Sequence, residues 1–355
     1  MVKVELDVLL EELVLREGSD LHLRVGEPPV FRVYGDLVRA DYPPLLTEDI
    51  EDILYRIMSP ERRARLEREL ELDMAYEIPG VARFRVNCFK LMGTLGTVMR
   101  IIPLKIKTID EWGFPSIFKD IANLPRGLVL ITGPTGSGKS TTLASIIETI
   151  NQTRHSHIIT IEDPIEFLHR DKLSIIEQRE IGIDTHSYAR ALKHVMRQNP
   201  DIILVGEMRD LETMAMALTA AETGHLIFST LHTIDAVQTI DRIIDVFPPQ
   251  QQPQIRIQLA STLQAVVTET LVPLKNRAGR VAAFEIMTCT AAIRSAIREA
   301  KTPQIYSFIQ TGAKLGMIQL DQYLKNLYFQ DIISFEDALA HSTNPDEFEK
   351  IAKPS

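Results

Sequence analysis

The residues with the clearest chemical purpose form a glycine-rich segment, GPTGSGKS, at positions 133–140. It fits the pattern GxxxxGK[ST], in which glycines let the backbone wrap around a phosphate group. Backbone N–H groups of residues 136–140 are expected to point at the phosphate oxygens, and the N-terminus of the following helix adds a positive dipole. Lys139 has the length to reach the β- and γ-phosphates, and the Ser140 hydroxyl is placed to hold Mg²⁺. The residues expected to bind the nucleotide are Thr135, Gly136, Ser137, Gly138, Lys139, Ser140 and Thr141.

Two glutamates and a histidine follow three later segments that are rich in β-branched and apolar residues. Glu162 follows residues 158–161, Glu207 follows residues 201–205, and His232 follows residues 226–230. Because ligands of open α/β sheets lie beyond the carboxyl ends of the strands, we expect these side chains at the same edge as the glycine-rich loop. Hydrolysis needs one carboxylate to orient or deprotonate water and a second to hold Mg²⁺ directly or through water, and Glu162 and Glu207 are the candidates. His232 would either sense the γ-phosphate or link neighbouring strands.

The elements that must position these residues change in character along the chain. From residue 128 onward, short β-branched runs alternate with longer helical stretches, which is typical of an α/β fold with a parallel sheet wound with helices. Before residue 103, an apolar helical stripe followed by short extended segments indicates an α+β domain. Prolines and glycines between the two parts suit a linker. The sequence thus predicts an N-terminal domain at 1–102, a linker at 103–127 and a third part at 128–355 that ends in a helical segment.

A further group of candidates consists of arginines in the N-terminal domain. Strand alternation places Arg83, Arg85 and Asn87 on one face of an expected strand. Arg100 lies in a mostly apolar strand, where an unpaired charge is costly. An arginine that meets phosphate only on domain closure would accelerate hydrolysis and couple it to motion. The alternatives are a solvated strand face for Arg83 and Arg85 and an internal ion pair for Arg100.

The composition excludes several classes of protein. Of 355 residues, 45% are hydrophobic and 25% are charged, with a net charge of −9, which excludes a disordered tail, a collagen-like fibre and a small disulfide scaffold. Cys88 and Cys289 are the only cysteines, so a four-cysteine zinc site is impossible. No apolar run reaches the roughly 18 residues needed to span a bilayer, and the N-terminus is too acidic for a signal peptide. We therefore expect a soluble, cytoplasmic protein.

Four motifs in order resemble the secretion and pilus ATPase superfamily, the hexameric motors of type II secretion and type IV pili. They are the phosphate loop, an aspartate box at 159–166, a Walker B-like segment at 199–210 and a histidine box between 219 and 233. The resemblance implies a PAS-like N-terminal domain, a RecA-like ATPase domain, and hydrolysis of ATP with Mg²⁺. It also implies Glu162 as the general base and Glu207, with Ser140, as the Mg²⁺-associated group. The arginines that it implies at a composite nucleotide site between the two domains are Arg83, Arg85 and Arg100.

Within this superfamily the chain is most similar to the ATPases that retract type IV pili. Its N-terminal part is short, it lacks the four-cysteine element of assembly ATPases, and the segment AIRSAIRE at 292–299 resembles a motif linked to retraction. Ser295 and Ala296 depart from that motif, and Ser229 is a choice shared with assembly motors. The resemblance implies a homohexamer at the inner face of the cytoplasmic membrane, which acts on a membrane platform protein and drives twitching motility.

Three alternatives stay open. The first is an assembly or secretion ATPase of the same superfamily, which the missing cysteines and short N-terminus disfavour. The second is a nucleic-acid ring motor, which the charge of −9 and the lack of an aromatic and basic stretch disfavour. The third is a nucleotide-gated scaffold without useful hydrolysis, which the two glutamates at strand ends disfavour.

Overall fold

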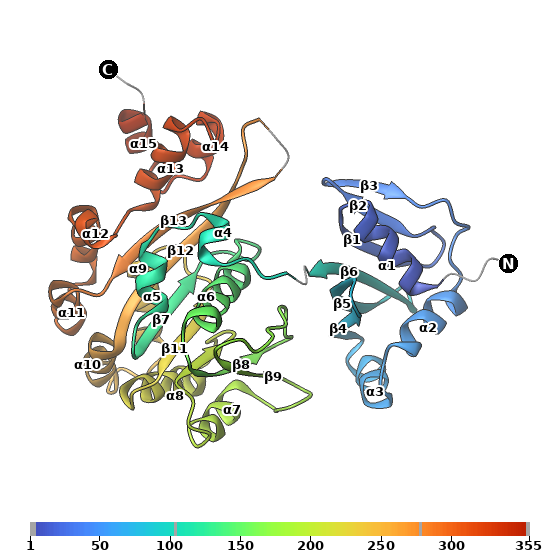
Figure 1. Ribbon diagram of the computed structural model, residues 1–355, viewed down its shortest axis with the longest axis horizontal. Helices are drawn as coiled ribbons and strands as arrows, with labels where there is room; N and C mark the ends of the chain where they lie inside the picture. Colours follow the sequence, from blue (N-terminus) through green and yellow to red (C-terminus); the bar gives the residue numbers. More distant parts are fainter. Residues whose placement is uncertain (1–4, 103–104, 277–278, 353–355) are drawn as a thin grey trace. The chain divides into compact units, whose positions relative to one another are not determined.

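The computed structural model describes residues 5–102, 105–276 and 279–352 and divides into two compact units. The first unit comprises Met1–Lys105 and Pro164–Leu168, and the second comprises Ile106–Asp163 and His169–Ser355 (Figure 1). A short piece of chain directly after Glu162 and Asp163 therefore belongs to the first unit.

The first unit is built around an antiparallel sheet of six strands in the order β3-β2-β1-β6-β5-β4. Its apolar face is covered by helices, and the stripe Leu6, Leu9, Leu10 and Leu13 is buried as the helical spacing predicted. The strands are β1 (Gly18–Arg24), β2 (Val30–Val33), β3 (Asp36–Arg39), β4 (Glu71–Ile78), β5 (Ala82–Leu91) and β6 (Thr94–Ile102). The helices are α1 (Leu6–Leu15), α2 (Thr47–Arg56) and α3 (Pro60–Glu69).

The predicted linker at 103–127 starts with two residues, 103 and 104, that lie outside the described part of the chain. From Ile106 onward this segment belongs to the second unit and forms the short helices α4 (Ile109–Trp112) and α5 (Ile117–Ala122). The hydroxyl of Thr108 and the carboxylate of Glu111 cap the start of α4, and Gly113 ends it with a left-handed backbone at φ 69°. The predicted linker is therefore partly helical, and its turn residues mark the ends of short helices.

The second unit has a seven-stranded sheet in the order β13-β12-β7-β11-β10-β8-β9, in which only β13, of the described strands, runs antiparallel to its neighbour. The strands are β7 (Gly127–Thr132), β8 (His157–Glu162), β9 (Ile175–Glu180), β10 (Ile202–Val205), β11 (Leu226–Leu231), β12 (Leu263–Pro273) and β13 (Arg280–Thr288). Strand β7 shows why helices cover both faces. Leu128 and Leu130 pack in one apolar core while Val129 and Ile131 pack in the other.

Helices cover both faces of this sheet, and further helices follow its last strand, β13 (Figure 1). They are α6 (Lys139–Thr153), α7 (Tyr188–Val195), α8 (Leu211–Glu222), α9 (Ala236–Asp245), α10 (Gln252–Thr262), α11 (Ala291–Arg298), α12 (Ile305–Thr311), α13 (Leu320–Phe329), α14 (Phe335–Ala340) and α15 (Pro345–Ala352). The last three share a small core around Leu324, Ile333 and Phe348, so the predicted helical C-terminal segment is present.

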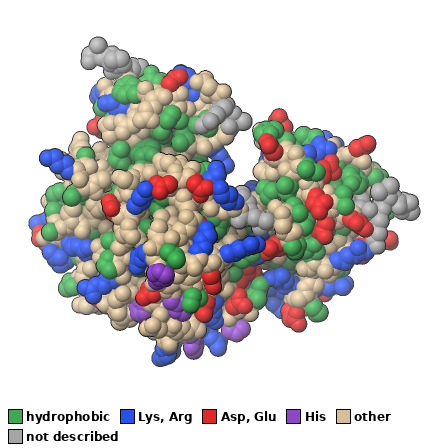
Figure 2. Space-filling view, in the orientation of Figure 1, with side chains coloured by type: hydrophobic (Ala, Val, Ile, Leu, Met, Phe, Trp, Pro, Cys, Tyr) green, Lys and Arg blue, Asp and Glu red, His purple; other side chains and the backbone are tan. Residues whose placement is uncertain are grey.

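Two surface properties complete the description. Over the visible face of the second unit, basic and acidic side chains are interspersed (Figure 2). In the part of the chain that the structure describes, no helix has the length and apolar character required to cross a bilayer.

Candidate active site

The phosphate loop connects the buried strand β7 to helix α6, as the motif requires. Gly133, Gly136 and Gly138 have φ values of 140°, 79° and 109°, which side chains other than glycine rarely adopt. A Cβ on Gly133 would lie 2.3 Å from the Glu269 carbonyl oxygen, so the loop tolerates no side chain there. The loop therefore has the backbone form of a phosphate cradle.

The predicted binding residues differ in exposure around this loop. Lys139 is buried, and its Nζ donates to the carbonyl oxygens of Gly133 and Pro134, each at 2.8 Å. Ser137 is also buried, and its Oγ has no hydrogen-bond partner among the described residues. Thr135, Gly136 and Ser140 are exposed, while Gly138 and Thr141 are half-buried. A nucleotide phosphate fits this arrangement, because it offers an acceptor for Ser137 and for the exposed N-terminus of α6.

A buried carboxyl group lies beneath the loop. Glu269 of β12 is 1% exposed, and its Oε2 accepts a hydrogen bond of 2.6 Å from Thr142 Oγ1. Its Oε1 has no hydrogen-bond partner among the described residues and lies 3.2 Å from the position that a Cβ on Gly138 would occupy. Burial raises the pKa of Glu269 to about 8, although Thr142 and Lys139 act in the opposite direction. The phosphate loop thus rests on an acid that is largely neutral at pH 7.

Glu162 ends β8, as predicted, and its carboxylate accepts hydrogen bonds from side chains of β8 and β9. Thr160 Oγ1 donates to Glu162 Oε1 at 2.6 Å, and Gln178 Nε2 donates to the same oxygen at 3.2 Å. Glu162 is half-buried at the carboxyl end of the sheet, which suits a group that accepts a proton from water.

Glu207 and His232 come together at the ends of the neighbouring strands β10 and β11. His232 Nε2 lies 3.1 Å from Glu207 Oε1, and Arg209 Nη2 lies 2.7 Å from Glu207 Oε2. The Glu207 side chain is only 15% exposed. This contact links the ends of two neighbouring strands, because His232 follows β11 and Glu207 follows β10; the γ-phosphate role of His232 stays a prediction.

Glu162 and Glu207 are brought close by Gly206 and bordered by a tyrosine. A Cβ on Gly206 would lie 3.1 Å from Tyr188 Oη, 3.2 Å from the Ile161 carbonyl oxygen and 3.4 Å from Glu162 Cα. Burial raises the pKa of Tyr188 well above its ordinary value, and the nearby charges of Asp163, Glu207 and Glu162 raise it further. Tyr188 therefore stays a neutral donor beside the two acids.

The three predicted arginines lie in the first unit, on the polar face of its sheet. Arg85 and Arg100 are direct cross-strand neighbours on β5 and β6. Arg85 Nη1 donates to Glu166 Oε1 at 2.8 Å, and Arg83 Nε donates to the Ile165 carbonyl oxygen at 3.3 Å. Both of these acceptors belong to the segment 164–168 of the same unit.

Arg100 differs from the expectation. Its side chain is 68% exposed rather than enclosed by the apolar strand, and it pairs at 2.8 Å with Asp20, whose side chain is 4% exposed. Strand alternation explains the difference, because Arg100 stands on the polar face of β6 while Met99 faces the core. The predicted alternative is an internal ion pair; a pair is present, but only its Asp20 partner is buried.

Four residues of the site escaped the sequence analysis. Gln178 is on β9, an edge strand of mixed polarity that no motif marks. Tyr188 begins α7, and Glu269 comes from a strand that was not predicted. Arg209 lies inside the Walker B-like segment, but its residue type indicated no role there. Only the pairing of strands β8 with β9 and β7 with β12 brings Gln178 and Glu269 to the site.

Comparison with known proteins places this site in a family. The family model described as type II/IV secretion system protein matches residues 1–319. The type IV pilus retraction ATPase PilT of Pseudomonas aeruginosa is 51% identical over 331 residues, which is 93% of this chain and 96% of that protein. A twitching motility protein of Neisseria gonorrhoeae is 48% identical over 316 residues, covering 89% of this chain and 84% of its own length. A crystal structure of the pilus retraction motor PilT with bound ADP superposes with a TM-score of 0.90 at 44% identity, covering 98% of this chain and 99% of the other.

The chain belongs to the type II/IV secretion system protein family, and it is an ATPase of that family. The predicted resemblance to the pilus retraction ATPases is confirmed by two relatives and a solved structure, which cover most of the chain. The predicted fold class, an α/β chain with an N-terminal domain, a C-terminal ATPase domain and a helical C-terminal segment, is confirmed as well. The solved PilT structure holds ADP.

Proposed function

We propose that this chain hydrolyses ATP with Mg²⁺ and uses the energy to retract type IV pili, which drives twitching motility. The observation that carries the proposal is the phosphate loop together with Glu162 and Glu207, which stand at the carboxyl ends of two strands of the same sheet. Relatives named as a pilus retraction ATPase and a twitching motility protein support the direction of the motor.

In the proposed mechanism, Lys139 exchanges the two loop carbonyls for the β- and γ-phosphates, and the N-terminus of α6 stabilises their charge. Ser140 and Glu207 would hold Mg²⁺, which proteins bind through few side chains plus phosphate oxygens and water. Bound Mg²⁺ would neutralise charge on the phosphates. His232 and Arg209 orient the Glu207 carboxylate, and Glu162 takes the proton of the attacking water.

We further propose that Arg83, Arg85 and Arg100 help to bind the nucleotide and stabilise charge that develops on its phosphates during hydrolysis. The exposed Arg100 and the Arg85 beside it offer guanidinium groups, which bind phosphate oxygens in pairs. To do so, Arg85 would exchange Glu166 for a phosphate, so that hydrolysis and the segment after Glu162 become linked.

The assembly and location are proposed from the same resemblance. We expect a homohexamer at the inner face of the cytoplasmic membrane, with an inner-membrane platform protein as its partner. We expect no nucleic-acid partner, since the net charge of −9 disfavours binding to a polyanion.

The test begins with steady-state phosphate release on protein sized by light scattering. Lys139→Ala is expected to lose ATP binding and turnover, and Glu162→Gln is expected to bind ATP while turnover falls by roughly 10² or more. Glu177→Gln, an exposed residue on β9, is the matched control and should leave turnover unchanged. Turnover of Glu162→Gln at the rate of the unaltered protein would refute the assignment of the base.

Two further measurements address the arginines and the motor. Arg85→Ala should lose turnover with its oligomer intact, whereas Arg56→Ala, on the exposed side of α2, should not. Expression in a piliated bacterium that lacks its own retraction ATPase should restore twitching, and the Glu162→Gln variant should not. An active ATPase that supports pilus extension instead would favour the assembly alternative.

A further inference from the structure

Gln178 connects the candidate general base to a loop of the same unit. In the parallel pairing of β8 and β9, Gln178 stands beside Thr160, two residues before Glu162. Its Nε2 donates to Glu162 Oε1 at 3.2 Å, and its Oε1 accepts from the backbone N–H of His169 at 2.8 Å. An amide has one donor end and one acceptor end, so the bond from His169 determines that the donor end faces Glu162.

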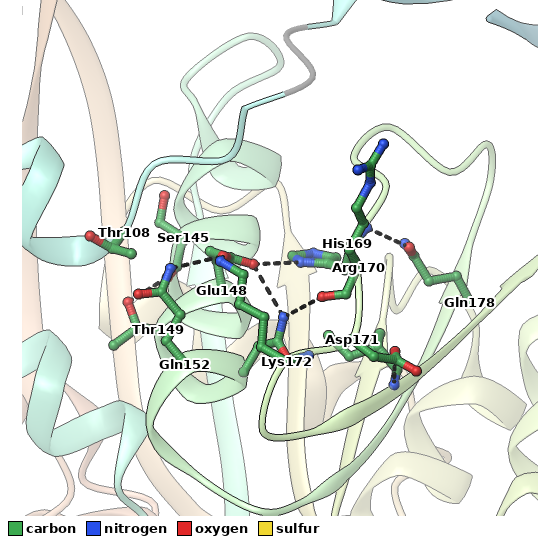
Figure 3. A network of polar contacts seen from close by, with 12 residues as sticks. Thr108, Ser145, Glu148, Thr149, Gln152, His169, Arg170, Asp171, Lys172 and Gln178 are labelled. Atoms are coloured by element: carbon green, nitrogen blue, oxygen red, sulfur yellow. Dashed lines mark hydrogen bonds and ion pairs between the residues drawn. The ribbon is translucent and has the colours of Figure 1, made fainter. Parts of the chain in front are cut away.

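The loop that contains His169 is anchored to the phosphate-loop helix α6. Glu148 of α6 has a side chain that is only 6% exposed, and both of its oxygens are engaged. His169 Nδ1 lies 3.6 Å from Glu148 Oε2, and Lys172 Nζ donates to Glu148 Oε1. Figure 3 shows both side chains directed toward Glu148, with Gln178 in contact with the backbone of the same loop.

Backbone contacts reinforce this anchor. Asn151, one turn after Glu148 on α6, donates from Nδ2 to the Arg170 carbonyl oxygen at 2.8 Å and accepts at Oδ1 from the Lys172 N–H at 3.0 Å. Burial alone would raise the pKa of Glu148, but the surrounding donors outweigh it and lower that pKa to about 2. The carboxylate thus stays charged at neutral pH, and Asn151 and Lys172 connect the loop to α6.

We propose that Gln178 is a positioning residue for Glu162, with its amide oriented by the backbone of His169 and with that loop held on α6 by Glu148. The inference rests on the proposed role of Glu162 as the general base. Gln178 contacts Glu162 without occupying the phosphate loop, so it acts on the chemical step and not on nucleotide binding. Accurate placement of a reacting group is worth up to about a hundredfold in rate per ångström.

The charges around Glu162 set what a substitution at position 178 does. Tyr188 of α7 interacts with Glu162 and with the neighbouring Asp163, Glu207 and Arg209. Gln178 of β9 is itself neutral, whereas Glu180 of the same strand is the register partner of Glu162 and is 6% exposed. Gln178→Glu therefore replaces a donor by a further carboxylate of similar shape, and carboxylates that share a site raise the pKa of at least one of them.

The experiment measures kcat and KM for Mg·ATP against pH in the full chain. Gln178→Glu should lower kcat at pH 7 by tenfold or more and move the acidic limb of its pH profile upward by about one unit. Gln178→Met, which keeps the volume but cannot donate, should lower kcat by about tenfold without a comparable movement of that limb. Neither variant should change KM by more than about twofold, and the neighbouring Glu177→Gln should match the unaltered protein throughout.

The outcomes separate this inference from the proposed function. If Glu162→Gln abolishes turnover while both Gln178 variants keep the kcat and acidic limb of the unaltered protein, the positioning role is refuted and the base stands. If Glu162→Gln retains full turnover, the base assignment fails first. If the Gln178 variants lose thermal stability and raise KM with no change in the acidic limb, Gln178 is merely structural and the inference is wrong.

Discussion

The buried acid beneath the phosphate loop makes a prediction whose size follows from the structure. Glu269 has an ordinary carboxyl pKa of 4.5 in the unfolded chain and about 8 in the fold, chiefly because burial penalises its charge. Between these values the folded protein holds a proton that the unfolded chain has released. Its contribution to stability is therefore complete below pH 4.5 and is lost as the pH rises through 8.

The magnitude is largest at and above neutral pH. Over the interval from 4.5 to 7, one proton corresponds to an upper bound of about 3 kcal/mol in the free energy of unfolding. Glu269→Gln keeps the side chain neutral at every pH and keeps an oxygen that can accept from Thr142. The variant should therefore be more stable than the unaltered protein at pH 7 by up to about 3 kcal/mol, and nearly equal to it at pH 5.

The assay is the thermal midpoint without nucleotide at pH 5, 7 and 8.5, because a bound ligand would stabilise the fold by mass action. With about 2–4 °C per kcal/mol for a unit of this size, the variant should gain up to roughly 6–12 °C at pH 7. Glu285, a second buried acid whose pKa burial raises to about 7, is the same in both proteins and does not enter the difference. The exposed Glu177→Gln is the control. A difference between variant and unaltered protein that is the same at all three pH values would show that Glu269 is ionised in the fold, and the reasoning would be wrong.

Two other substitutions test the geometry of the site. His232→Ala removes the contact of 3.1 Å with Glu207, so we expect kcat to fall by about tenfold and the Mg²⁺ concentration for half-maximal phosphate release to rise. An unchanged Mg²⁺ dependence would separate His232 from the metal site. Gly206→Ala places a Cβ 3.2 Å from the Ile161 carbonyl oxygen and 3.1 Å from Tyr188 Oη, so unfolding in urea should show a loss of about 1–3 kcal/mol together with reduced turnover. If the variant keeps the stability and turnover of the unaltered protein, the residues around Gly206 accommodate the added Cβ and the expected clash is wrong.

The parts of the fold that the sequence predicted are those with local signals. Strands β7, β8, β10 and β11 are runs dominated by apolar and β-branched residues, because both of their faces are covered by helices. The phosphate loop is specified by glycines whose positive φ values no other residue adopts without strain. In these places the chemistry of single residues determines the structure.

The missed strands lack such signals. Strand β4 follows α3 through Leu70, which takes a left-handed backbone at φ 67° in a position where glycine is the usual marker. Strand β12 follows α10 with no residue between Thr262 and Leu263, so no turn residue announces the change. Strand β9 lies at the edge of the sheet and has a largely polar sequence, IIEQRE, in which apolar and polar residues do not alternate clearly.

Glu269 shows why the remainder of the site depends on the assembled fold. In the sequence it stands between Thr268 and Thr270, and no motif marks it. The pairing of β12 with β7 sets Thr268 opposite Thr132, the last residue before the phosphate loop, and their hydroxyls lie 2.8 Å apart. After Thr132 the phosphate loop passes close to β12, and Gly133 packs against the carbonyl oxygen of Glu269. The loop therefore covers Glu269. A carboxyl group enclosed in this way stays uncharged, so a property that bears on the phosphate loop arises from strand register rather than from any motif.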